Sequence, residues 1–451
     1  MMATTTALSP RPTRVRYLML AMLFLASTFS YGDRVVLSIA GISFSRDLHL
    51  DPLHMGYLFS GFSWAYVAAQ LPSGGLLDRF GTRPVYGFSI IAWSLCAVFA
   101  GLAGFLGPAL AFTAIFALRL LSGLAQAPVF PGNGRVVAAW FPTRERGTAS
   151  AIFNSSQYFA VVLFAPVMAW ITHTHGWKGC FWFLGLLGLL LALLWFRLAT
   201  DVAGNPRINA TEVELIQQGG GLGSIGPATR ASGSVSLTWA TLGHLLRNRM
   251  LLGIYLGQYC IVTLTWFFLT WFPLYLSQAR HMSLLKVGFV ATLPALCGSI
   301  GGISGGVFSD RLLRRGHSLS LARKTPIILG MSLSMTMIAC NYLNTQWLIV
   351  LLMSLAFFGK GFGALGWTVI SDTSPRGMIG INGSVFNLIG NLAGITTPIL
   401  IGYIVQRTGS FQYALLFVAA MALLAIVAYL PIVGTIRRLE PQDIIPTHAQ
   451  D

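Results

Sequence analysis

The chain has 451 residues, of which 55% are hydrophobic and only 9% are charged, and its formal net charge is +16. A soluble domain carries about 25% charged residues, and the mean hydropathy here is +0.70, so the composition excludes an ordinary soluble protein and predicts a membrane-embedded one. The basic residues stand between apolar runs instead of forming one patch, so the positive charge does not indicate nucleic-acid binding.

The N-terminal segment carries Arg11, Arg14 and Arg16, and an apolar stretch begins at Tyr17. A signal peptide has an apolar region of about 7–15 residues followed by a cleavage site. This stretch continues to Ile42, which suffices for a bilayer span of roughly 20 residues. We therefore expect a first span that is retained, preceded by a tail at 1–16.

Eleven further apolar stretches follow, and the fold class expected is an all-α membrane protein of twelve spans in two pseudo-symmetric six-helix halves. The predicted spans are 17–42, 54–77, 84–104, 107–131, 147–172, 177–199, 250–277, 284–308, 324–343, 346–371, 379–405 and 411–435. They form bundles at 17–199 and 250–436, joined by a linker at 200–249 and followed by a tail at 437–451.

The linker is polar and rich in Gly and Ser. Within it, Thr211 and Glu214 read as a capping box that opens a short helix. The segment 237–249 is expected to lie along the membrane surface, and a flexible solvated linker is the alternative.

The distribution of Lys and Arg predicts the orientation, because cytoplasmic loops carry an excess of both. With the N-terminus inside, the cytoplasmic segments hold 21 of the 29 basic residues. The opposite face holds Arg46, Lys178, Arg280, Lys286 and Arg407. We therefore expect both termini in the cytoplasm.

A short motif occurs at equivalent places after the second and the eighth span. Its residues are Gly74, Asp78, Arg79 and Arg83 in the first copy and Gly306, Asp310 and Arg311 in the second. Two related halves around a midplane site are typical of transporters. Glycine permits close helix approach, and the Asp–Arg pair is expected to bridge neighbouring helix ends and to break as the halves move. The alternative is a tight turn with an arginine that reaches the interface.

This repeated motif resembles the signature of the major facilitator superfamily. Longer runs resemble its anion:cation symporter branch, in particular the bacterial D-glucarate/galactarate and galactonate transporters. The matching runs are 31–34 (YGDR), 140–142 (WFP), 146–154 (RGTASAIFN), 266–273 (WFFLTWFP) and 357–367 (FFGKGFGALGW). The resemblance covers nearly the whole chain and implies a sugar-acid transporter of the bacterial inner membrane.

Four charged residues lie deep in the predicted spans: Asp33, Arg34, Arg119 and Lys360. A charge at the bilayer centre costs about 2.5–3.5 kcal/mol on insertion scales and is usually functional. The alternative is a set of charge pairs that lock helices together. Three cations cannot be neutralised by one carboxylate, so a bound anion is the expected complement.

The expected roles follow from the side-chain chemistry. Arg34 and Arg119 carry planar guanidinium groups suited to binding a carboxylate through two hydrogen bonds. Asp33 is the only acidic residue deep in a span, and the resemblance implies that it is a protonation site. The resemblance also implies that hydroxyl, amide and aromatic groups line the sugar-acid site at Tyr31, Tyr66, Gln157, Gln258, Trp367 and Asn387.

Lys360 points to the class of sugar acid. A monoacid needs one cationic clamp, whereas a diacid such as glucarate or galactarate gains from a second. Helical periodicity places Lys360 on one face with Trp367, and we expect it to bind the distal carboxylate. The alternatives are a lysine that extends towards the inner face of the membrane and a lysine paired with Asp372, which at about 18 Å along a helix is too far for direct pairing.

Position 126 departs from the family pattern, because Gln126 stands where the resemblance implies a glutamate that takes part in proton coupling. Moving one charge through 100 mV costs about 2.3 kcal/mol, so a dianion entering a negative-inside cell needs at least two protons. Asp33 supplies one. Weaker coupling, coupling through another group or an exchange mode, and a substituted variant of a glutamate-bearing parent all remain open.

The sequence contains no paired nucleophile and base and no metal-ligand motif, so we expect neither an enzyme nor a cofactor. The expected partners are a sugar-acid anion, protons and lipid, and we expect a monomer. The alternatives are a galactonate or hexuronate monoacid symporter and an organic-anion exchanger with weakened proton coupling.

Overall fold

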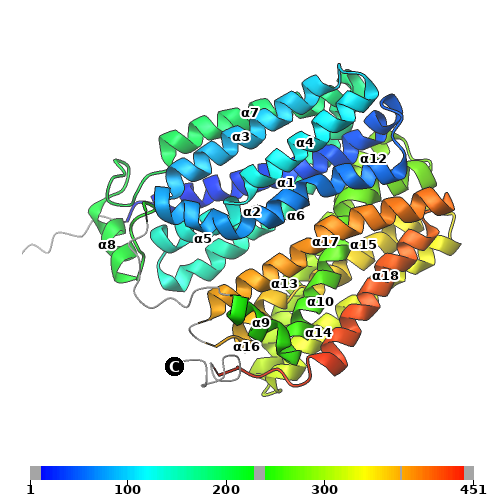
Figure 1. Cartoon of the computed structure of the whole chain (residues 1–451). Coiled ribbons are helices and arrows are strands. Elements are labelled where there is room, and N and C mark those ends of the chain that lie inside the picture. The colour runs from blue at the N-terminus through cyan, green and yellow to red at the C-terminus, as the bar shows by residue number, and fades with distance from the viewer. Residues whose placement is uncertain (1–11, 228–238, 376–377, 441–451) are drawn as a thin grey trace, which may run out of the picture.

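The computed structural model describes residues 12–227, 239–375 and 378–440. The described residues form helices joined by short connections, and no strand occurs among them. Figure 1 shows two groups of helices side by side, which we call the first bundle (α1–α7) and the second bundle (α10–η5). Most of the two predicted tails and residues 228–238 of the predicted linker lie outside the described residues.

The first bundle contains α1 (Val15–Asp47), α2 (Pro52–Phe80), α3 (Thr82–Ala103), α4 (Pro108–Gln126), α5 (Val129–Trp140), η1 (Thr143–Glu145), α6 (Arg146–His175) and α7 (Trp177–Leu198). Two short helices, α8 (Ala210–Gln218) and α9 (Trp239–Arg247), follow it. The second bundle contains α10 (Arg249–Trp266), η2 (Phe267–Trp271), α11 (Phe272–Leu274), η3 (Tyr275–Ala279), α12 (Leu284–Val290), α13 (Thr292–Arg314), α14 (Leu319–Ser334), η4 (Met335–Tyr342), α15 (Gln346–Phe362), α16 (Gly366–Thr373), α17 (Ile379–Thr408), α18 (Gln412–Val427) and η5 (Ala428–Ile432).

Each predicted span coincides with one of these helices or with consecutive ones. In the described part of the chain, ten helical stretches are long and apolar enough to cross a bilayer. The helix α2 is not among the ten and contains several Ser and Gly residues. The helix α14 is not among them either, because it is only 16 residues long and continues as the 3₁₀ helix η4.

Besides the break at Ala291 between α12 and α13 and the 3₁₀ end of the span that begins with α14, three predicted spans are interrupted. Pro128 and Pro273 have no backbone N–H to donate. Pro128 lies between α4 and α5, and Pro273 lies in the short helix α11 between two π-helical segments. The third interruption is the segment 363–365 between α15 and α16. Isolated π-helical turns occur frequently at functional sites, and η2 contributes residues to the pocket described below.

The helices extend further than predicted at one end of the molecule, which we call the arginine-rich end. There α2 continues to Phe80 and α13 continues to Arg314, so both copies of the Gly-x-x-x-Asp-Arg motif are helical. The turns come afterwards, at Gly81 (φ 82°) and Gly316 (φ 81°), where a side chain would be strained. The prediction of spans that stop before the motif was therefore too short.

The two bundles contact each other closely at the opposite, arginine-poor end. A Cβ on Gly56 of α2 would lie 2.6 Å from the carbonyl oxygen of Pro398 in α17. A Cβ on Gly288 of α12 would lie 2.4 Å from the Cβ of Ala169 in α6. Glycine is therefore required at both contacts, because any larger residue would push the bundles apart.

The first part of the predicted linker is folded onto the first bundle. Thr82 N donates to Ile225 O at 2.7 Å, and Thr143 N donates to Gly219 O at 2.8 Å. The side chains of Val202, Ile216 and Ile225 are buried against α5, α6 and α7. A flexible solvated linker is thus wrong for residues 200–227. Within the surface segment expected at 237–249, residues Trp239–Arg247 form the helix α9. Residues 237–238 lie outside the described residues.

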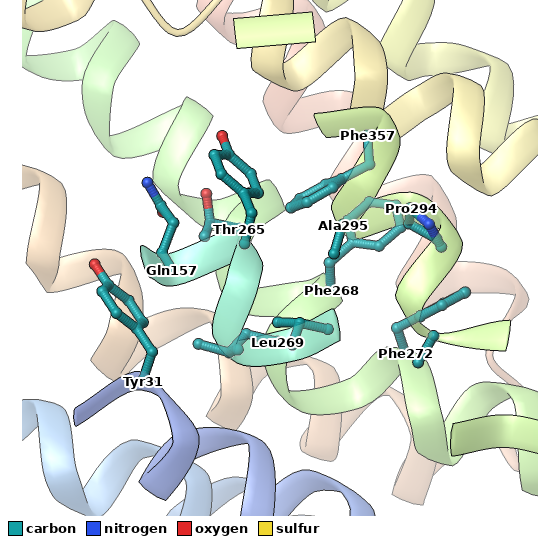
Figure 2. A pocket seen from close by; sticks show the side chains of 12 residues that line it. Tyr31, Gln157, Thr265, Phe268, Leu269, Phe272, Pro294, Ala295 and Phe357 are labelled. Atoms are coloured by element: carbon teal, nitrogen blue, oxygen red, sulfur yellow. The ribbon is translucent and has the colours of Figure 1, made fainter. Parts of the chain in front are cut away.

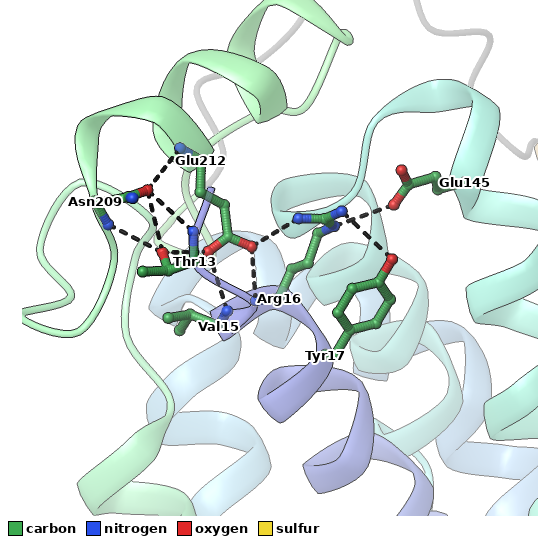
Figure 3. Close-up of polar contacts among 7 residues, drawn as sticks. All are labelled: Thr13, Val15, Arg16, Tyr17, Glu145, Asn209 and Glu212. Atoms are coloured by element: carbon green, nitrogen blue, oxygen red, sulfur yellow. Dashed lines mark hydrogen bonds and ion pairs between the residues drawn. The ribbon is translucent and has the colours of Figure 1, made fainter. Parts of the chain in front are cut away.

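Glu212 of α8 caps the start of α1 (Figure 3). Its carboxylate accepts hydrogen bonds from Val15 N (3.0 Å) and Arg16 N (3.3 Å), and it forms an ion pair with Arg16 Nη1 at 2.8 Å. These backbone groups begin α1 and have no partner within the helix. The other side of the Arg16 guanidinium pairs with Glu145 at 3.1 Å.

The predicted capping box is wrong in its residues, although the short helix exists. The N-cap of α8 is Asn209, whose side chain accepts from Glu212 N at 2.9 Å. Thr13 N donates to the same Asn209 oxygen at 3.2 Å. The two helix starts therefore cap each other, a long-range arrangement that a local pattern does not reveal.

Replacement of the buried Glu212 by alanine is expected to lower the free energy of unfolding by about 2–4 kcal/mol, because two backbone donors and one buried guanidinium group lose their acceptor. Thermal unfolding of the purified protein in detergent measures this loss. The matched control is Glu214→Ala on the exposed face of the same helix. Equal melting temperatures for both variants and the unchanged protein would contradict the capping role.

Candidate functional site

A buried ion pair between α1 and α4 lies at the centre of the first bundle. Arg119 Nη1 lies 2.7 Å from Asp33 Oδ2, and both side chains are almost fully buried. Gln126 Nε2 donates to the same Asp33 oxygen at 3.2 Å. Ser30 Oγ donates to Gln126 Oε1 at 2.7 Å, which turns the amide group so that its N–H₂ faces Asp33. The predicted proton site is thus held by one cation and one neutral donor.

Arg34 lies in a cage of aromatic rings beside this pair, because the guanidinium carbon of Arg119 lies 5.4 Å from the ring centre of Phe62, one of the rings of the cage. Its guanidinium carbon lies 4.4 Å from the ring centre of Phe62, 4.5 Å from that of Tyr31 and 6.0 Å from that of Tyr66. Cation–π contacts of this kind orient a guanidinium group but leave its charge in place. Among the described residues Arg34 forms no ion pair, and its buried Nε has no hydrogen-bond partner.

Lys360 is a second buried cation without a counter-charge. It is 5% exposed, and its ammonium nitrogen lies 5.2 Å from the ring centre of Phe357 and 5.8 Å from that of Tyr158. In the described ranges no carboxylate pairs with it. The alternative partner Asp372 is excluded, because it pairs with Arg323 Nε at 2.8 Å.

Glycines fix the position of Lys360 within the second bundle. A Cβ on Gly359 would lie 2.4 Å from Gly330 O of α14, and one on Gly361 would lie 2.1 Å from Gly298 O of α13. The helix α15 therefore packs backbone to backbone against two neighbours at this level. Lys360 contacts Tyr158 of α6, so it meets the first bundle.

A pocket lies between the two bundles (Figure 2). Its polar lining residues are Tyr31, Gln157, Tyr158 and Thr265, and its apolar lining includes Phe268, Leu269, Phe272 and Phe357. Figure 2 shows the polar atoms of Tyr31, Gln157 and Thr265 pointing to the same side, away from Leu269 and Phe272. The guanidinium group of Arg34 lies over the ring of Tyr31, and the ammonium group of Lys360 lies near the rings of Phe357 and Tyr158, so each cation contacts a residue that lines the pocket.

Three residues that the family resemblance assigned to the site lie elsewhere in the second bundle. Trp367 is 54% exposed and packs edge-on against Phe386 at 5.2 Å. Asn387 accepts hydrogen bonds from Asn391. The side chain of Gln258 lies close to Gly366 and Gly390. None of the three lines the pocket in this conformation.

The prediction that Lys360 and Trp367 share a helical face is wrong. The helix α15 ends at Phe362, and α16 begins only at Gly366. The intervening residues break the 3.6-residue period on which the prediction depended. Lys360 is buried beside the pocket, whereas Trp367 is mostly exposed.

The repeated motif residues lie at the arginine-rich end, and their aspartates bridge helices within each bundle. Asp78 Oδ1 pairs with Arg135 Nη1 of α5 at 2.6 Å, and Asp310 Oδ1 pairs with Arg323 Nη1 of α14 at 3.4 Å. The expected partners, Arg79 and Arg311, do not form these bridges. Arg79 lies over the ring of Phe80, and Arg83 donates to Phe196 O at 2.7 Å.

The motif glycines make no close helix contact in this conformation. A Cβ on either Gly74 or Gly306 would meet no atom of the described chain within 4 Å. The arginine-rich end thus leaves open space where the sequence predicted close approach.

Several site residues were missed by the sequence analysis. Ser30 precedes Asp33 by three positions and therefore shares its helical face, which was an available signal. Tyr158 follows the predicted site residue Gln157 directly, but nothing in the sequence showed that it contacts Lys360 across the bundle interface. Arg135 and Arg323 were counted only as loop charges, because pairing between distant helices is invisible without the fold.

Comparisons with known proteins agree with this architecture. A family model described as Major Facilitator Superfamily matches residues 23–340. A relative named probable galactarate/D-glucarate transporter GudP, from Bacillus subtilis (strain 168), is 54% identical, with 95% of this chain and 94% of the relative covered. The protein of the same name from Escherichia coli (strain K12) is 52% identical, with 95% of each chain covered. A D-galactonate transporter from Escherichia coli O6:H1 is 37% identical, with 95% and 98% covered.

Solved structures share the fold at low sequence identity. An inward-facing, unoccupied bacterial homologue of the human lysosomal transporter Spinster aligns with a TM-score of 0.76 at 16% identity, covering 95% of this chain and 99% of that one. A D-xylose-proton symporter aligns with a TM-score of 0.70 at 14% identity, covering 94% and 99%.

The buried pair predicts a specific double-mutant result. Arg119→Leu leaves Asp33 without its buried partner and is expected to cost about 3–5 kcal/mol of stability. Combining it with Asp33→Asn removes the uncompensated charge and is expected to recover most of that loss. Melting temperatures of the two single variants, the double variant and the unchanged protein measure the coupling. Additive losses in the double variant would show that the two side chains do not stabilise each other.

Proposed function

The chain belongs to the major facilitator superfamily, and we propose that it takes up the hexaric acids galactarate and D-glucarate by proton-coupled alternating access across the bacterial inner membrane. The observation that carries the proposal is that two buried cations, Arg34 and Lys360, form no ion pair within the described residues and each contact a residue that lines the pocket between the bundles. A substrate with two carboxylates and a polyol chain complements this arrangement.

The lining of the pocket fits the body of such a substrate. Hydroxyl and amide groups such as those of Tyr31, Gln157 and Thr265 both donate and accept hydrogen bonds, as the hydroxyl groups of a sugar acid require. Arg34 offers a guanidinium fork to one carboxylate and Lys360 a compact charge to the other. The relatives that are 54% and 52% identical are named as probable galactarate/D-glucarate transporters, which supports the same substrates.

The topology that this function needs is two six-helix halves with twelve crossings. The helices α2 and α14–η4 bring the ten apolar stretches to twelve crossings, because both pack among those stretches and coincide with predicted spans. The excess of arginine at one end favours that end as the cytoplasmic one. In the described conformation the arginine-poor end is closed by glycine contacts and the motif glycines at the other end are free of contacts, an arrangement suited to an inward-open state.

Asp33 is the proposed proton carrier. It is the one carboxylate buried at the level of the site, and protonation would release Arg119 and Gln126 from it. An altered hydrogen-bond network between α1 and α4 gives the proton a route to influence the conformation of the first bundle.

Gln126 supports a second candidate, an exchanger of organic anions with weak proton coupling. Its amide donates to Asp33 where a glutamate would place a second titratable group. A dianion carried with one proton moves against a negative-inside potential at a cost of about 2.3 kcal/mol per 100 mV for the uncompensated charge. Exchange of one dianion for another avoids this cost.

The substrate assignment is tested with protein purified into liposomes. Galactarate uptake is expected to saturate and to be driven by an inward proton gradient, and galactarate is expected to raise the melting temperature of the protein. Galactitol, which has the same hydroxyl groups but no carboxylate, is expected to do neither. Equal uptake of galactitol and galactarate would contradict a site built around cations.

The coupling is tested with the variant Gln126→Glu. A second carboxylate beside Asp33 is expected to raise the number of protons carried per galactarate, and a pH-sensitive dye inside the liposomes measures that number. Gln217→Glu, on the exposed surface of α8, is the control. Asp33→Asn is expected to lose proton flux but to retain exchange of galactarate for galactarate. Unchanged stoichiometry in Gln126→Glu would exclude position 126 from the coupling.

A further inference from the structure

The two unpaired cations of the pocket belong to different bundles. Arg34 lies on α1 and contacts aromatic rings of the first bundle. Lys360 lies on α15 of the second bundle and contacts the ring of Tyr158 across the interface. Any movement of one bundle relative to the other therefore changes the separation of these two charges.

The contacts that join the bundles at the arginine-poor end involve little charge. They consist of glycine and backbone approaches such as Gly56 to Pro398, together with the hydrogen bond from Ser38 Oγ to Thr270 O at 2.9 Å. At the level of the pocket, the rings of Tyr158 and Phe357 lie with their centres 6.3 Å apart, and Phe62 of α2 is buried in one cluster with Trp266 of α10. These contacts are apolar too, so a charged attraction between the bundles around the pocket has to come from what the pocket binds.

An empty pocket opposes closure. Closing the arginine-rich end removes water from the pocket, and two like charges in a poorly polarisable environment repel each other more strongly than in water. Both cations are already almost fully buried in this conformation, so closure adds only the desolvation cost of removing the water that remains near them. Asp33 already pairs with Arg119 and accepts from Gln126, so it offsets the charge of Arg34 only in part, and no carboxylate among the described residues pairs with Lys360.

A diacid reverses the sign of this interaction. One carboxylate binds the guanidinium group of Arg34 and the other binds the ammonium group of Lys360, so the substrate connects α1 to α15. A monoacid that occupies Arg34 leaves Lys360 uncompensated, and closure then still carries the cost of one buried charge.

We propose that the diacid closes the transporter by bridging Arg34 and Lys360, so that a sugar acid with a single carboxylate binds to the open state but is carried poorly. This inference rests on the proposed function, because it assumes that the pocket between the bundles holds the sugar acid. It adds that Lys360 selects the substrate at the closing step and only weakly at the binding step.

The first test compares galactarate with D-galactonate on the unchanged protein in liposomes. D-Galactonate has the same chain of hydroxyl groups, but a hydroxymethyl group replaces one terminal carboxylate. It is expected to compete with galactarate for uptake, while its own maximal rate is lower by about 30-fold or more, as the loss of one buried charge pair requires. Transport of D-galactonate at the maximal rate of galactarate would overturn the inference and leave the proposed function standing.

The second test uses Lys360→Met, which keeps the length of the side chain and removes its charge. Galactarate is expected to behave on this variant as D-galactonate does on the unchanged protein: its maximal rate falls about 30-fold or more, while its dissociation constant changes less. Lys360→Arg is expected to restore part of the rate, and Lys286→Met on the exposed surface of α12 is the matched lysine control.

The outcomes separate the two levels of the argument. A Lys360→Met protein that carries galactarate at the unchanged maximal rate overturns the bridging role of Lys360. Failure of the unchanged protein to bind or carry galactarate at all overturns the proposed function and this inference with it. If Lys360→Met does not fold, as judged by its melting curve, the comparison of the two acids on the unchanged protein decides alone.

Discussion

The single carboxylate of Asp33 determines the electrostatics of the whole site. It is shared between Arg119 and Gln126, and Ser30 fixes the amide that completes its surroundings. Buried charges are stable in proteins only when they are paired and hydrogen-bonded. Because Asp33 neutralises Arg119, the positive charges of Arg34 and Lys360 remain, and the pocket between them is a place for an anion. The proposed anionic substrate supplies the negative charge that Arg34 and Lys360 lack.

Backbone packing gives this balance its geometry. Gly359 and Gly361 let α15 approach α14 and α13 so closely that Lys360 has a defined place beside the pocket. On the other side, aromatic rings from α1 and α2 surround the Arg34 guanidinium group. Both cations are thus fixed by their neighbours before any substrate arrives. A preorganised site of this kind spends little of the binding free energy on ordering side chains.

The sequence predicted the helical architecture well, because long apolar stretches have few other solutions in a membrane. It also found the four charges that lie deep in the apolar spans, since a charge inside an apolar run is conspicuous, but it did not find that Arg16, Glu212 and Arg323 are buried as well. It failed where one helix meets another. The pairing of Asp78 with Arg135, the capping of α1 by Glu212 and the contact of Lys360 with Tyr158 join residues that are far apart in the chain. It also failed at the break between α15 and α16, where three residues shift the helical phase and move Trp367 away from Lys360.

The glycine contacts between α2 and α17 have a consequence for how such a transporter diversifies. At Gly56 and Gly402 the opposing surface is main chain, so almost any substitution there forces the bundles apart. The cations of the pocket are side chains on separate helices, and neither takes part in those contacts. Substitution of these cations would therefore change which anion the proposed site accepts and leave the glycine contacts between α2 and α17 unchanged. Proteins with this fold can thus acquire new substrates through a few substitutions of charged residues while the contacts between the bundles are retained.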